Sequence, residues 1–456
     1  MEKNRTISLP ENAKRIIETL EQAGYEAYAV GGCVRDSLIG RDPQDWDITT
    51  SARPEQVKAL FHRTVDTGLQ HGTVTVMLQK EGFEVTTFRL DGVYEDGRHP
   101  KEVTFTPSLE EDLKRRDFTI NAMAYNESRG LVDLFGGLED LERKVLRCVG
   151  DPMERFGEDA LRMLRAVRFS AQLGLSIDPE TLGGIRKLAG TLSKISAERI
   201  QTELTKLLLS DHPEYLRTAW ETGLTAVFFP EFDKAMRTPQ NHPHHCYNVG
   251  EHILRTLTGV PAQKDLRLTM LLHDIAKPET MTVDPDGTTH FKGHAALGEK
   301  MSREILRRWK YDNHTIDHVS HLVRIHDYGM YLEPDEVRAR RALMRMGAED
   351  VDNYLLIRRA DVLAQSEYLR EEKFANIQAW KEALRGVLER EECYSLKDLA
   401  VNGSDLIREG FRPGPGIGEV LQSLLETVIE APEKNTKDTL LEEAKAWKAC
   451  KEEATS

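Results

Sequence analysis

The feature that most constrains the fold is a change of pattern near residue 150 of this 456-residue chain. Short β-type runs, separated by turns rich in Gly, Asp and Pro, fill about the first 145 residues. After Asp151-Pro152, helical periodicity dominates almost to the C-terminus. This pattern predicts an α+β chain in which a small mixed domain precedes helical ones, and the length favours two to four domains.

The first part is expected to hold one early helix and four strands. The helix is expected over residues 11–23, because Pro10 suits a first turn and Gly24 suits a stop. The strands are expected over residues 26–30, 46–50, 73–78 and 83–90. Later helices are expected over segments that include residues 159–173, 196–209, 266–276 and 299–309.

Charge composition limits the partners of the chain. The formal net charge is −14, from 62 Lys and Arg against 76 Asp and Glu. Because phosphate contacts need Lys and Arg, this balance argues against indiscriminate nucleic-acid binding but leaves room for a local nucleic-acid site. Basic groups occur at residues 114–116, 307–310 and 338–345, and the last two are expected to be solvated helix faces.

The sequence gives no signal for a membrane or for secretion. No apolar run approaches the length of a membrane-spanning helix, and the first residues lack the regions of a signal peptide. The five cysteines are scattered and include no C-x-x-C pair, so a disulfide framework is not expected. These features predict a protein of the reducing cytoplasm without a membrane partner.

The strongest chemical signal is the run Gly31-Gly32-Cys33-Val34-Arg35-Asp36, followed by Asp45-Trp46-Asp47. Glycines directly after a strand let backbone N–H groups approach a triphosphate, and Arg35 adds positive charge. Residues two apart on a strand point to the same side, so Asp45 and Asp47 would face one pair of Mg²⁺ ions. Such a pair suits in-line nucleotidyl transfer, with one metal on the attacking 3′-hydroxyl and the other on the pyrophosphate. Alone, each motif is commonly an ordinary turn or a pair of loop acids, and their order and spacing together favour the metal site.

A third acid is expected beside this pair. Glu84 is acidic within a run of β-forming residues at 83–89. It is either a third catalytic carboxylate or an exposed charge on an edge strand, and the sequence leaves both interpretations open.

These motifs resemble the signature of class II tRNA nucleotidyltransferases and bacterial poly(A) polymerases, within the DNA polymerase beta superfamily. The resemblance continues in family order through residues 111–122, 133–137, 158–162 and 196–200, and spans residues 25 to 210 or so. It implies a polymerase-beta-like palm and template-independent nucleotidyl transfer to tRNA, with CTP and ATP as substrates.

The resemblance also implies roles for individual residues. Arg116 would contact phosphates, with a surface ion pair as the alternative, and Asp112 with Asn121 would bind the ribose hydroxyls. Arg165 and Arg168 match family positions near the triphosphate. The whole expected nucleotide-binding set is Gly32, Arg35, Asp112, Arg116, Asn121, Asp159, Arg162, Arg165 and Arg168.

The run at residues 158–162 predicts a base-selecting pair on a helix. At about 100° per residue, Asp159, Arg162 and Arg165 would lie along one helix face. Asp supplies acceptors and Arg a planar fork of donors, so the two can imitate the Watson–Crick edge of a base. In the family this pair is a protein template that accepts cytosine or adenine and rejects guanine and uracil. An isolated pair at this spacing is usually a weak surface salt bridge, but the surrounding motifs favour the template.

A second constellation of metal-ligating residues follows in the helical part. His252, His273-Asp274 and Asp361 resemble the H…HD…D pattern of HD phosphohydrolases, with His294 and His326 as further candidate ligands. Such a set can hold one or two divalent metals and activate water on a phosphoester. A purely structural use of these residues is the alternative.

The predicted architecture has four parts. They are a nucleotidyltransferase palm at 1–147, a helical neck for base recognition and RNA binding at 148–240, an HD domain at 241–370 and a helical C-terminal unit at 371–456. The predicted reaction adds CCA to tRNA 3′ ends and releases pyrophosphate, using Mg²⁺ held by Asp45 and Asp47, with Glu84 as the third acid. The alternatives are an enzyme that adds only the terminal A, a poly(A) polymerase, which the mixed to acidic C-terminal tail disfavours, and a phosphohydrolase centred on the HD domain. The sequence indicates no oligomeric state.

A polar, turn-rich segment at residues 91–107 joins two catalytic elements. The commoner role of such a loop is that of an inert connector. In tRNA nucleotidyltransferases that add A, however, a loop at this position is implicated in the change from CTP to ATP. The segment therefore predicts an enzyme that goes on to add A, rather than one that stops after C.

Overall fold

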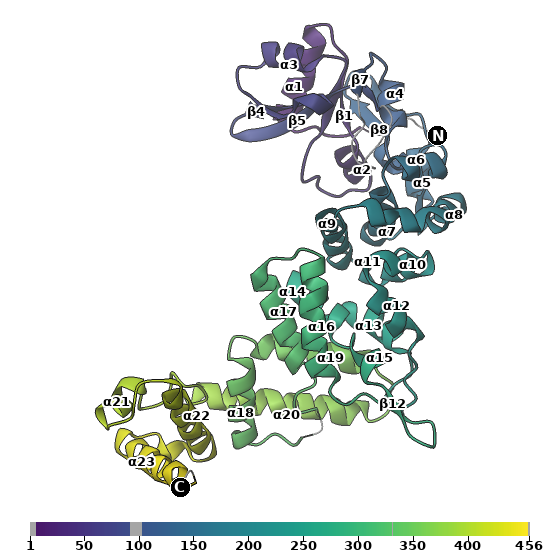
Figure 1. The fold of residues 1–456 in the computed structure, drawn as a ribbon. Helices are drawn as coiled ribbons and strands as arrows, with labels where there is room; N and C mark the ends of the chain where they lie inside the picture. Colours follow the sequence, from purple (N-terminus) through teal and green to yellow (C-terminus); the bar gives the residue numbers. More distant parts are fainter. Residues whose placement is uncertain (1–5, 92–102, 331, 455–456) are drawn as a thin grey trace. The chain divides into compact units, whose positions relative to one another are not determined.

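The computed structural model describes residues 6–91, 103–330 and 332–454 (Figure 1). The chain divides into two compact units, Met1–Pro230 and Glu231–Ser456. A mixed sheet followed by helices makes up the first unit, and helices with one short hairpin make up the second. The α+β class and the change of pattern near residue 150 are thus confirmed. Residues 92–99, the centre of the predicted loop, lie outside the described residues.

A seven-stranded sheet with the order β3-β4-β5-β2-β1-β8-β9 forms the N-terminal part of the first unit. All its pairings are antiparallel except that of β2 with β5, which is parallel. The strands are β1 (Ala27–Val30), β2 (Ile48–Thr50), β3 (Thr64–Gly68), β4 (Thr73–Leu78), β5 (Glu81–Thr87), β8 (Met123–Asn126) and β9 (Gly130–Asp133).

The strand expected over residues 83–90 is instead two strands. Phe88 separates β5 from β6 (Arg89–Asp91), and its N–H donates to the carbonyl of Thr50 in β2 at 2.8 Å. β6 then leaves the large sheet and pairs with β7 (Val103–Phe105). The physical reason is that the fully buried Phe88 ring joins the core below the sheet while the backbone turns away.

Two helices cover this core. α1 (Glu11–Gln22) buries Ala13, Ile16, Ile17 and Leu20 on one face, and Gly24 at φ +87° follows its end, as the sequence predicts. α4 (Leu109–Lys114) places Leu113 among Tyr28, Val30 and Phe88. Residues of the strands and Leu113 of α4 thereby share one hydrophobic cluster, which includes Val30, the residue before the glycine motif.

The rest of the first unit is mainly helical, with one short parallel pair of strands, β10 (Val145–Leu146) and β11 (Ser176–Ile177). Its α-helices are α2 (Gly32–Leu38) and α3 (Pro54–Leu60) within the sheet region, then α5 (Gly137–Glu142), α6 (Pro152–Glu158), α7 (Leu161–Leu173), α8 (Pro179–Leu188), α9 (Ala197–Leu208), α10 (Leu216–Glu221) and α11 (Thr225–Phe228). The helix expected over 159–173 begins two residues late, because Asp159 is extended, with φ −142°, and ends α6. The carboxylate of Asp159 accepts from the N–H of Leu161, as a capping side chain does.

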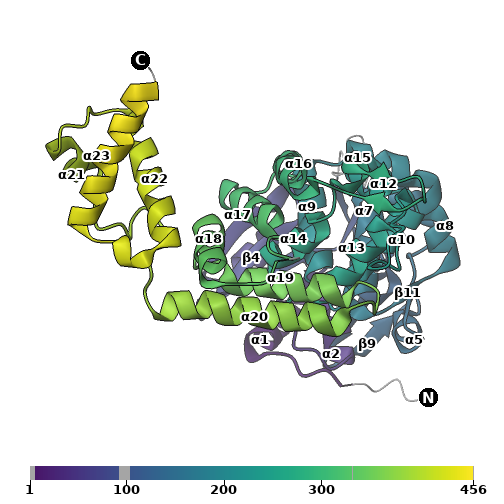
Figure 2. The ribbon, with the colours of Figure 1, turned by 90° about the horizontal axis from the view of Figure 1, so that it is seen from below.

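The second unit is built from helices α12 to α20 before its C-terminal bundle. They are α12 (Pro230–Arg237), α13 (Val249–Leu257), α14 (Lys264–Leu272), α15 (Lys277–Thr280), α16 (His294–Arg308), α17 (Asn313–Ile325), α18 (Glu336–Met346), α19 (Val351–Leu363) and α20 (Arg370–Glu389). The hairpin β12 (Thr282–Val283) and β13 (Thr289–His290) separates α15 from α16. Figure 2 shows α20 as a long helix beside α18 and α19, both of which it contacts.

The helix expected over 266–276 ends early, at Leu272. His273 and Asp274 therefore lie in a turn between α14 and α15, and not on a helix. Periodicity extends the expected helix because Ile275 and Ala276, the last two residues of the turn, are as buried as the helix residues before it. The helix expected over 299–309 begins earlier, at His294.

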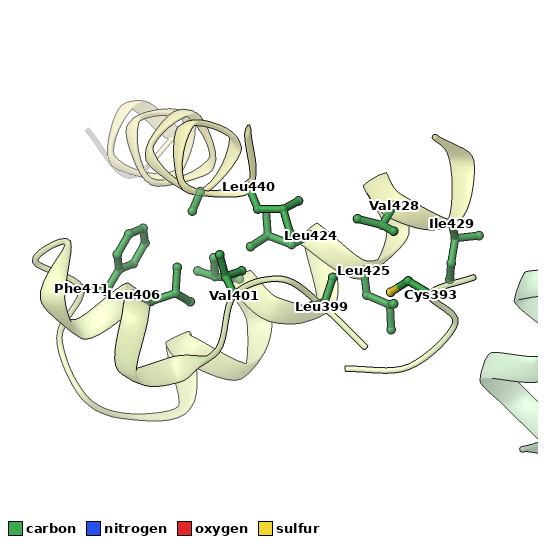
Figure 3. Packing of buried hydrophobic residues seen from close by; sticks show 12 residues of the cluster. Cys393, Leu399, Val401, Leu406, Phe411, Leu424, Leu425, Val428, Ile429 and Leu440 are labelled. Carbon is green, nitrogen blue, oxygen red and sulfur yellow. The ribbon is translucent and has the colours of Figure 1, made fainter. Parts of the chain in front are cut away.

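A three-helix bundle ends the second unit, with α21 (Gly403–Arg408), α22 (Pro415–Glu430) and α23 (Lys437–Ala454). Its core gathers side chains from all three helices and from the segment before them, as Figure 3 shows for Leu406, Leu424 and Leu440. Helix α18 packs against α22. No helix of the described ranges is long and apolar enough to cross a membrane.

One basic run is not the solvated face that the sequence predicts. On α18, Arg340 is only 2% exposed and donates to the carbonyl of Ile429 at 2.8 Å and to the carboxylate of Glu392 at 2.5 Å. A guanidinium is buried in this way only where its charge and its donors are matched. Arg340 therefore ties α18 to the C-terminal bundle.

Candidate active site

The glycine motif begins where β1 ends. Gly31 has φ +82°, a region that side chains rarely adopt, and a Cβ there would lie 2.9 Å from Nη1 of Arg116. Its N–H donates to the carbonyl of Met123 on β8. Glycine is therefore required at residue 31, both by the backbone conformation and by the close approach of a guanidinium. Gly32 then opens α2, one turn of which places Arg35 under the motif.

Arg35 is almost fully buried, at 8% exposure, and its donors are all directed. Nη1 donates to Oδ1 of Asn121 at 2.6 Å, while Nε and Nη2 donate to the neighbouring Asp36. The structure thus brings together two residues of the expected nucleotide set that lie 86 positions apart.

The two aspartates of the metal motif lie just before β2 and not on it, which corrects the sequence expectation. The ladder to β1 ends at the pair Ala29–Ile48, and the segment before Ile48 leaves the sheet. Asp47 is nevertheless held in place, because its carbonyl accepts from the N–H of Val30 at 3.0 Å. Both carboxylates reach solvent at the edge of the sheet.

Glu84 joins this pair through the parallel register of β2 and β5. Ile48 pairs with Val85, so Asp47, the residue before β2, lies near Glu84, the residue before Val85 on β5. Although Asp47 reaches solvent, partial burial raises its pKa; Arg116 opposes that shift, and the carboxylates of Glu84 and Asp45 add to it. Crowded carboxylates of this kind gain most from a bound cation.

Asp112 is buried more deeply than a side chain that a ribose could reach from solvent. It is fully buried, accepts from the hydroxyl of Thr49 at 3.1 Å and from Nη2 of Arg115 at 2.7 Å, and lies 3.6 Å from Nη2 of Arg116. Burial would raise the pKa of Asp112, but the two arginines outweigh it and lower the pKa. Asp112 therefore anchors the arginines below the site, and a contact with ribose stays a prediction.

The two residues expected to select the base, Asp159 and Arg162, do not pair with each other. Asp159 forms a two-pronged ion pair with Arg199 of α9, at 2.6 and 3.2 Å, and Arg162 pairs with Glu158 at 2.5 Å. Arg162 also donates to the carbonyls of Arg155 and Arg115. Of these two residues, Arg162 lies on α7 and Asp159 does not, so the prediction that both lie on one helix face is wrong. Each of the two is instead held by an opposite charge.

Arg165 and Arg168, one turn further along α7, are held by acids. Arg165 donates two hydrogen bonds to Asp117, at 2.9 and 2.6 Å, and Arg168 donates one to Glu203 of α9 at 2.7 Å. Burial would raise the pKa of Asp117, but Arg165 and the hydrogen bond from Asn121 hold it well below its usual range. Arg165 is the more accessible of the two arginines, with a third of its side chain exposed.

In the second unit, the residues of the H…HD…D pattern form one buried cluster. Nε2 of His252 lies 2.8 Å from Asp361 and 3.3 Å from Nε2 of His273, and Oδ2 of Asp274 lies 3.3 Å from His273. These distances bring residues of α13, the turn after α14, and α19 to one point.

His294 and His326 extend the cluster on its other side. Their Nε2 atoms lie 3.2 Å apart, and 3.5 and 3.8 Å from Oδ1 of Asp274. Asp274 therefore belongs to both three-residue groups of ligand atoms that lie within 4.8 Å of one another in the described parts of the chain. The three palm carboxylates are not among those groups.

The imidazoles are oriented for ligation. Nδ1 of His252, His273, His294 and His326 each bonds a backbone carbonyl, at 3.2, 2.8, 2.8 and 2.7 Å. With the Nδ1 proton donated outward, the lone pair of Nε2 faces the cluster. This set of oriented ligand atoms fits divalent metal ions. The spacing of the residues in the sequence shows which residues could be ligands but not how their imidazoles are oriented.

A pocket of about 510 Å³ opens beside the cluster. Its lining includes Asp274 and Asp361, together with the ammonium groups of Lys277, Lys292 and Lys373. Lys277 lies 2.7 Å from Asp274, and Lys373 donates to Gln365, which in turn donates to Asp361. The pocket thus combines metal-ligating groups with cations that suit a phosphoester.

Known protein families match along most of the chain. The sequence model of the Poly A polymerase head domain matches residues 27–147, that of an RNA- and SrmB-binding site of polymerase A matches residues 174–236, and that of tRNA nucleotidyltransferase domain 2 matches residues 289–444. The CCA-adding enzyme of Lactiplantibacillus plantarum is 38% identical over 434 residues, which cover 95% of both chains. That of Levilactobacillus brevis is 38% identical over 444 residues, covering 94% of this chain and 96% of the relative.

The chain belongs to the CCA-adding enzyme family.

Solved structures of the family agree with this assignment. The chain resembles the Bacillus stearothermophilus CCA-adding enzyme in complex with CTP, with a TM-score of 0.71, 33% identity, and coverage of 97% and 98% of the two chains. The Thermotoga maritima CCA-adding enzyme complexed with tRNA shares the fold, with a TM-score of 0.60 and 22% identity. Membership confirms the resemblance inferred from the motifs and makes the chain a nucleotidyltransferase.

Four residues lie beside the expected site residues, and no sequence motif predicts the contacts that they make. Asp117 and Arg199 lie inside motifs that the resemblance identifies, but no pattern indicates that they hold Arg165 and Asp159. Glu203 and Phe169 carry no motif signal, because each looks like part of an ordinary helix. Acids buried within a helix, such as Glu203 at 4% exposure, would have marked the site had burial been known.

Proposed function

We propose that the protein adds CCA to the 3′ ends of tRNA from CTP and ATP, without an RNA template, and releases pyrophosphate. The observation that carries the proposal is the end-to-end likeness to CCA-adding enzymes, with the catalytic motifs assembled in one unit. Its likeness to a family structure in complex with CTP supports the choice of nucleotide. A cytoplasmic location belongs to the same proposal and is supported by the scattered cysteines.

Asp45, Asp47 and Glu84 would hold Mg²⁺ at the edge of the sheet. Such ions activate a 3′-hydroxyl and neutralise the departing pyrophosphate. The raised pKa of Asp47 supports the fit, because partial burial and, to a smaller extent, the carboxylates of Glu84 and Asp45 disfavour its negative charge, which a cation would stabilise. Arg35 and Arg116 would bring positive charge to a triphosphate at the glycine motif, since their guanidinium groups lie 3.7 and 2.9 Å from where a Cβ of Gly32 and of Gly31 would be.

Base choice would rest on Asp159 and Arg162. Cytosine and adenine both present an exocyclic amino donor beside a ring-nitrogen acceptor, which match a carboxylate and a guanidinium. Guanine and uracil present a carbonyl acceptor beside an N–H donor, which would face like groups and leave both residues unpaired. Arg199 and Glu158 support this role, because they fix the two side chains before a nucleotide binds.

The four-part division remains part of the proposal, with the palm at 1–147, the neck at 148–240, the HD domain at 241–370 and the C-terminal unit at 371–456. The match to the head-domain model ends at the proposed palm boundary, which supports it.

The test offers the purified protein a tRNA that lacks CCA, with CTP and ATP separately and together. Incorporation of two C residues and then A supports the proposal. Incorporation of ATP alone, on tRNA ending in CC, selects an enzyme that adds only the terminal A. A long run of A on any RNA end selects a poly(A) polymerase.

A second activity is proposed for the cluster in the second unit, namely metal-dependent hydrolysis of a phosphoester. The observation that favours it is the set of four imidazoles whose Nε2 atoms converge on Asp274 and Asp361. His252, His273, Asp274 and Asp361 would hold one divalent ion, and His294 and His326 a second one shared through Asp274. Metals in such a site activate water for attack on phosphorus. Hydrolysis of p-nitrophenyl phosphate or its diester by Mn²⁺-loaded protein tests it.

A further inference from the structure

One aromatic ring lies at the centre of three arginines in the nucleotide site. Phe169 on α7 is 7% exposed, and the guanidinium carbons of Arg168, Arg35 and Arg165 lie 3.4, 5.1 and 5.3 Å from the centre of its ring. On another side the ring meets the edge of Phe118, with centroids 5.9 Å apart and planes at 77°. Phe169 therefore links the glycine motif, the palm residues around Phe118, and α7.

The three guanidinium groups carry like charges and repel one another, so neighbouring groups must offset this repulsion. Carboxylates do part of this, since Asp36, Asp117 and Glu203 each accept from one of the arginines. A carboxylate, however, occupies the N–H donors that a phosphate would need. An aromatic face attracts a cation through its quadrupole and leaves the in-plane N–H groups free.

We propose that Phe169 is a positioning residue that holds Arg35, Arg165 and Arg168 together for the triphosphate of either nucleotide. The inference rests on the proposed function, in which these arginines bind the triphosphate. Its role is separate from base choice, because the ring lies against the three arginines, whereas Asp159 is held by Arg199 and Arg162 by Glu158. CTP and ATP carry the same triphosphate, so the ring acts on both alike.

The test replaces Phe169 by phenylalanines with progressively more fluorine, up to pentafluorophenylalanine. Fluorination reduces the negative electron density on the ring face and nearly preserves the shape and apolar character of the ring. The fold is therefore expected to be retained. We expect the KM for CTP and for ATP to rise together with each step, by about tenfold over the series, with little change in kcat. Phe169→Leu is expected to show at least the same rise.

The matched control is the same fluorination series at Phe156. This ring is also buried in the same unit, at 0% exposure against 7% for Phe169, and no cation lies over it among the described residues. Unchanged KM values there, with an unchanged melting temperature, assign the effect at residue 169 to the cation contacts.

Two outcomes overturn the inference. One is a series at residue 169 that keeps the wild-type KM for both nucleotides, and the other is a change confined to CTP or to ATP. Failure of the wild-type protein to extend tRNA would refute the proposed function instead. In that case calorimetry with inorganic tripolyphosphate still decides whether the ring governs phosphate affinity, since affinity that is indifferent to fluorination refutes the positioning role.

Discussion

At the scale of single residues, the palm site depends on carboxylates whose charges are crowded. Replacing Asp47 by Ala, or Asp45 by Ala, removes one of the carboxylates that, on the proposed function, would hold Mg²⁺ together with Glu84. We expect each variant to lose incorporation of both CTP and ATP by at least about a hundredfold, because both nucleotides would use the same metals. Incorporation of labelled CTP and ATP into tRNA measures this.

Asp42→Ala is the matched control for these variants. Asp42 is an exposed acid in the same loop and lies outside the metal motif. Near wild-type incorporation of one nucleotide by either metal-site variant would contradict a single shared site.

The base-selecting pair makes a different prediction. Asp159→Ala and Arg162→Ala each remove one half of the hydrogen-bonding pattern and free the partner that held it, Arg199 or Glu158. We expect selection to relax, so that UTP or GTP is admitted at the expense of CTP and ATP, while Mg²⁺ binding survives. Competition among the four nucleotides, followed by sequencing of the added ends, measures the preference. An equal loss with all four would mean that the pair is only structural.

At the scale of elements, one histidine joins three helices of the second unit. His318 of α17 bonds Asp265 of α14 at 2.6 Å and Asp350, at the start of α19, at 2.9 Å. Partial burial lowers the pKa of His318, but the two carboxylates outweigh it and raise the pKa above its ordinary value. Two other groups face the same acids, since Lys264 lies 4.0 Å from Asp265 and His321 lies 3.7 Å from Asp350.

The sign of the pH effect follows from the raised pKa. Charged His318 stabilises the unit fully below its ordinary pKa near 6.5, and the contribution is lost as pH rises through the higher folded pKa. We expect His318→Gln to lower the free energy of unfolding by about 2 kcal/mol at pH 6 and by less at pH 8. Urea unfolding at both pH values measures it, with the exposed His314→Gln on the same helix as control. An equal loss at both pH values would rule out the charged histidine as the cause.

A loop is the second element with a prediction of its own. Residues 92–99 lie between β6 and β7, which pair as a hairpin next to β5, the strand that carries Glu84. Two bases of different size must meet the same Asp159 and Arg162, so something has to adjust the site between C and A. We expect deletion of residues 92–99 to leave addition of two C residues and to stop before A.

Gel analysis of the products at single-nucleotide resolution distinguishes the outcomes of this deletion. Products that still end in CCA contradict a role for the loop in the change of nucleotide. Products without any C would instead indicate collapse of the palm, which circular dichroism of the variant checks.

At the scale of the whole molecule, the two proposed activities belong to different compact units. We expect the double variant His273→Ala and Asp274→Ala to keep CCA addition within about twofold and to lose metal-dependent hydrolysis of p-nitrophenyl esters, because it removes ligands of both groups around Asp274. The same preparation is assayed for both reactions, and bound Mn²⁺ is measured beside them. A well-folded double variant without nucleotidyl transfer would contradict the separation.

Much of this organisation could be predicted from the sequence, for physical reasons that differ between residues. The glycine motif and His273-Asp274 carry their chemistry in adjacent positions, so their order and spacing among the other motifs indicate them. The proximity of Asp47 to Glu84 depends on a parallel strand pairing, which a single sequence does not specify. Glu203 and Phe169 gain their roles only from partners brought close by packing, and helical periodicity treats both as ordinary members of a helix. Periodicity likewise missed the turn at His273, since burial continues through it.

Buried Arg340 on α18 limits where the chain can be divided into stable fragments. A fragment that ended near Glu389 would lack the carboxylate of Glu392, which pairs with Arg340, and the carbonyl of Ile429, which accepts from it. It would also expose the apolar residues of α18 that pack against the bundle core. Anyone who divides the protein for crystallography or for separate assays should therefore cut before α12 and leave the C-terminal end intact through Ala444, the last buried residue of the bundle core.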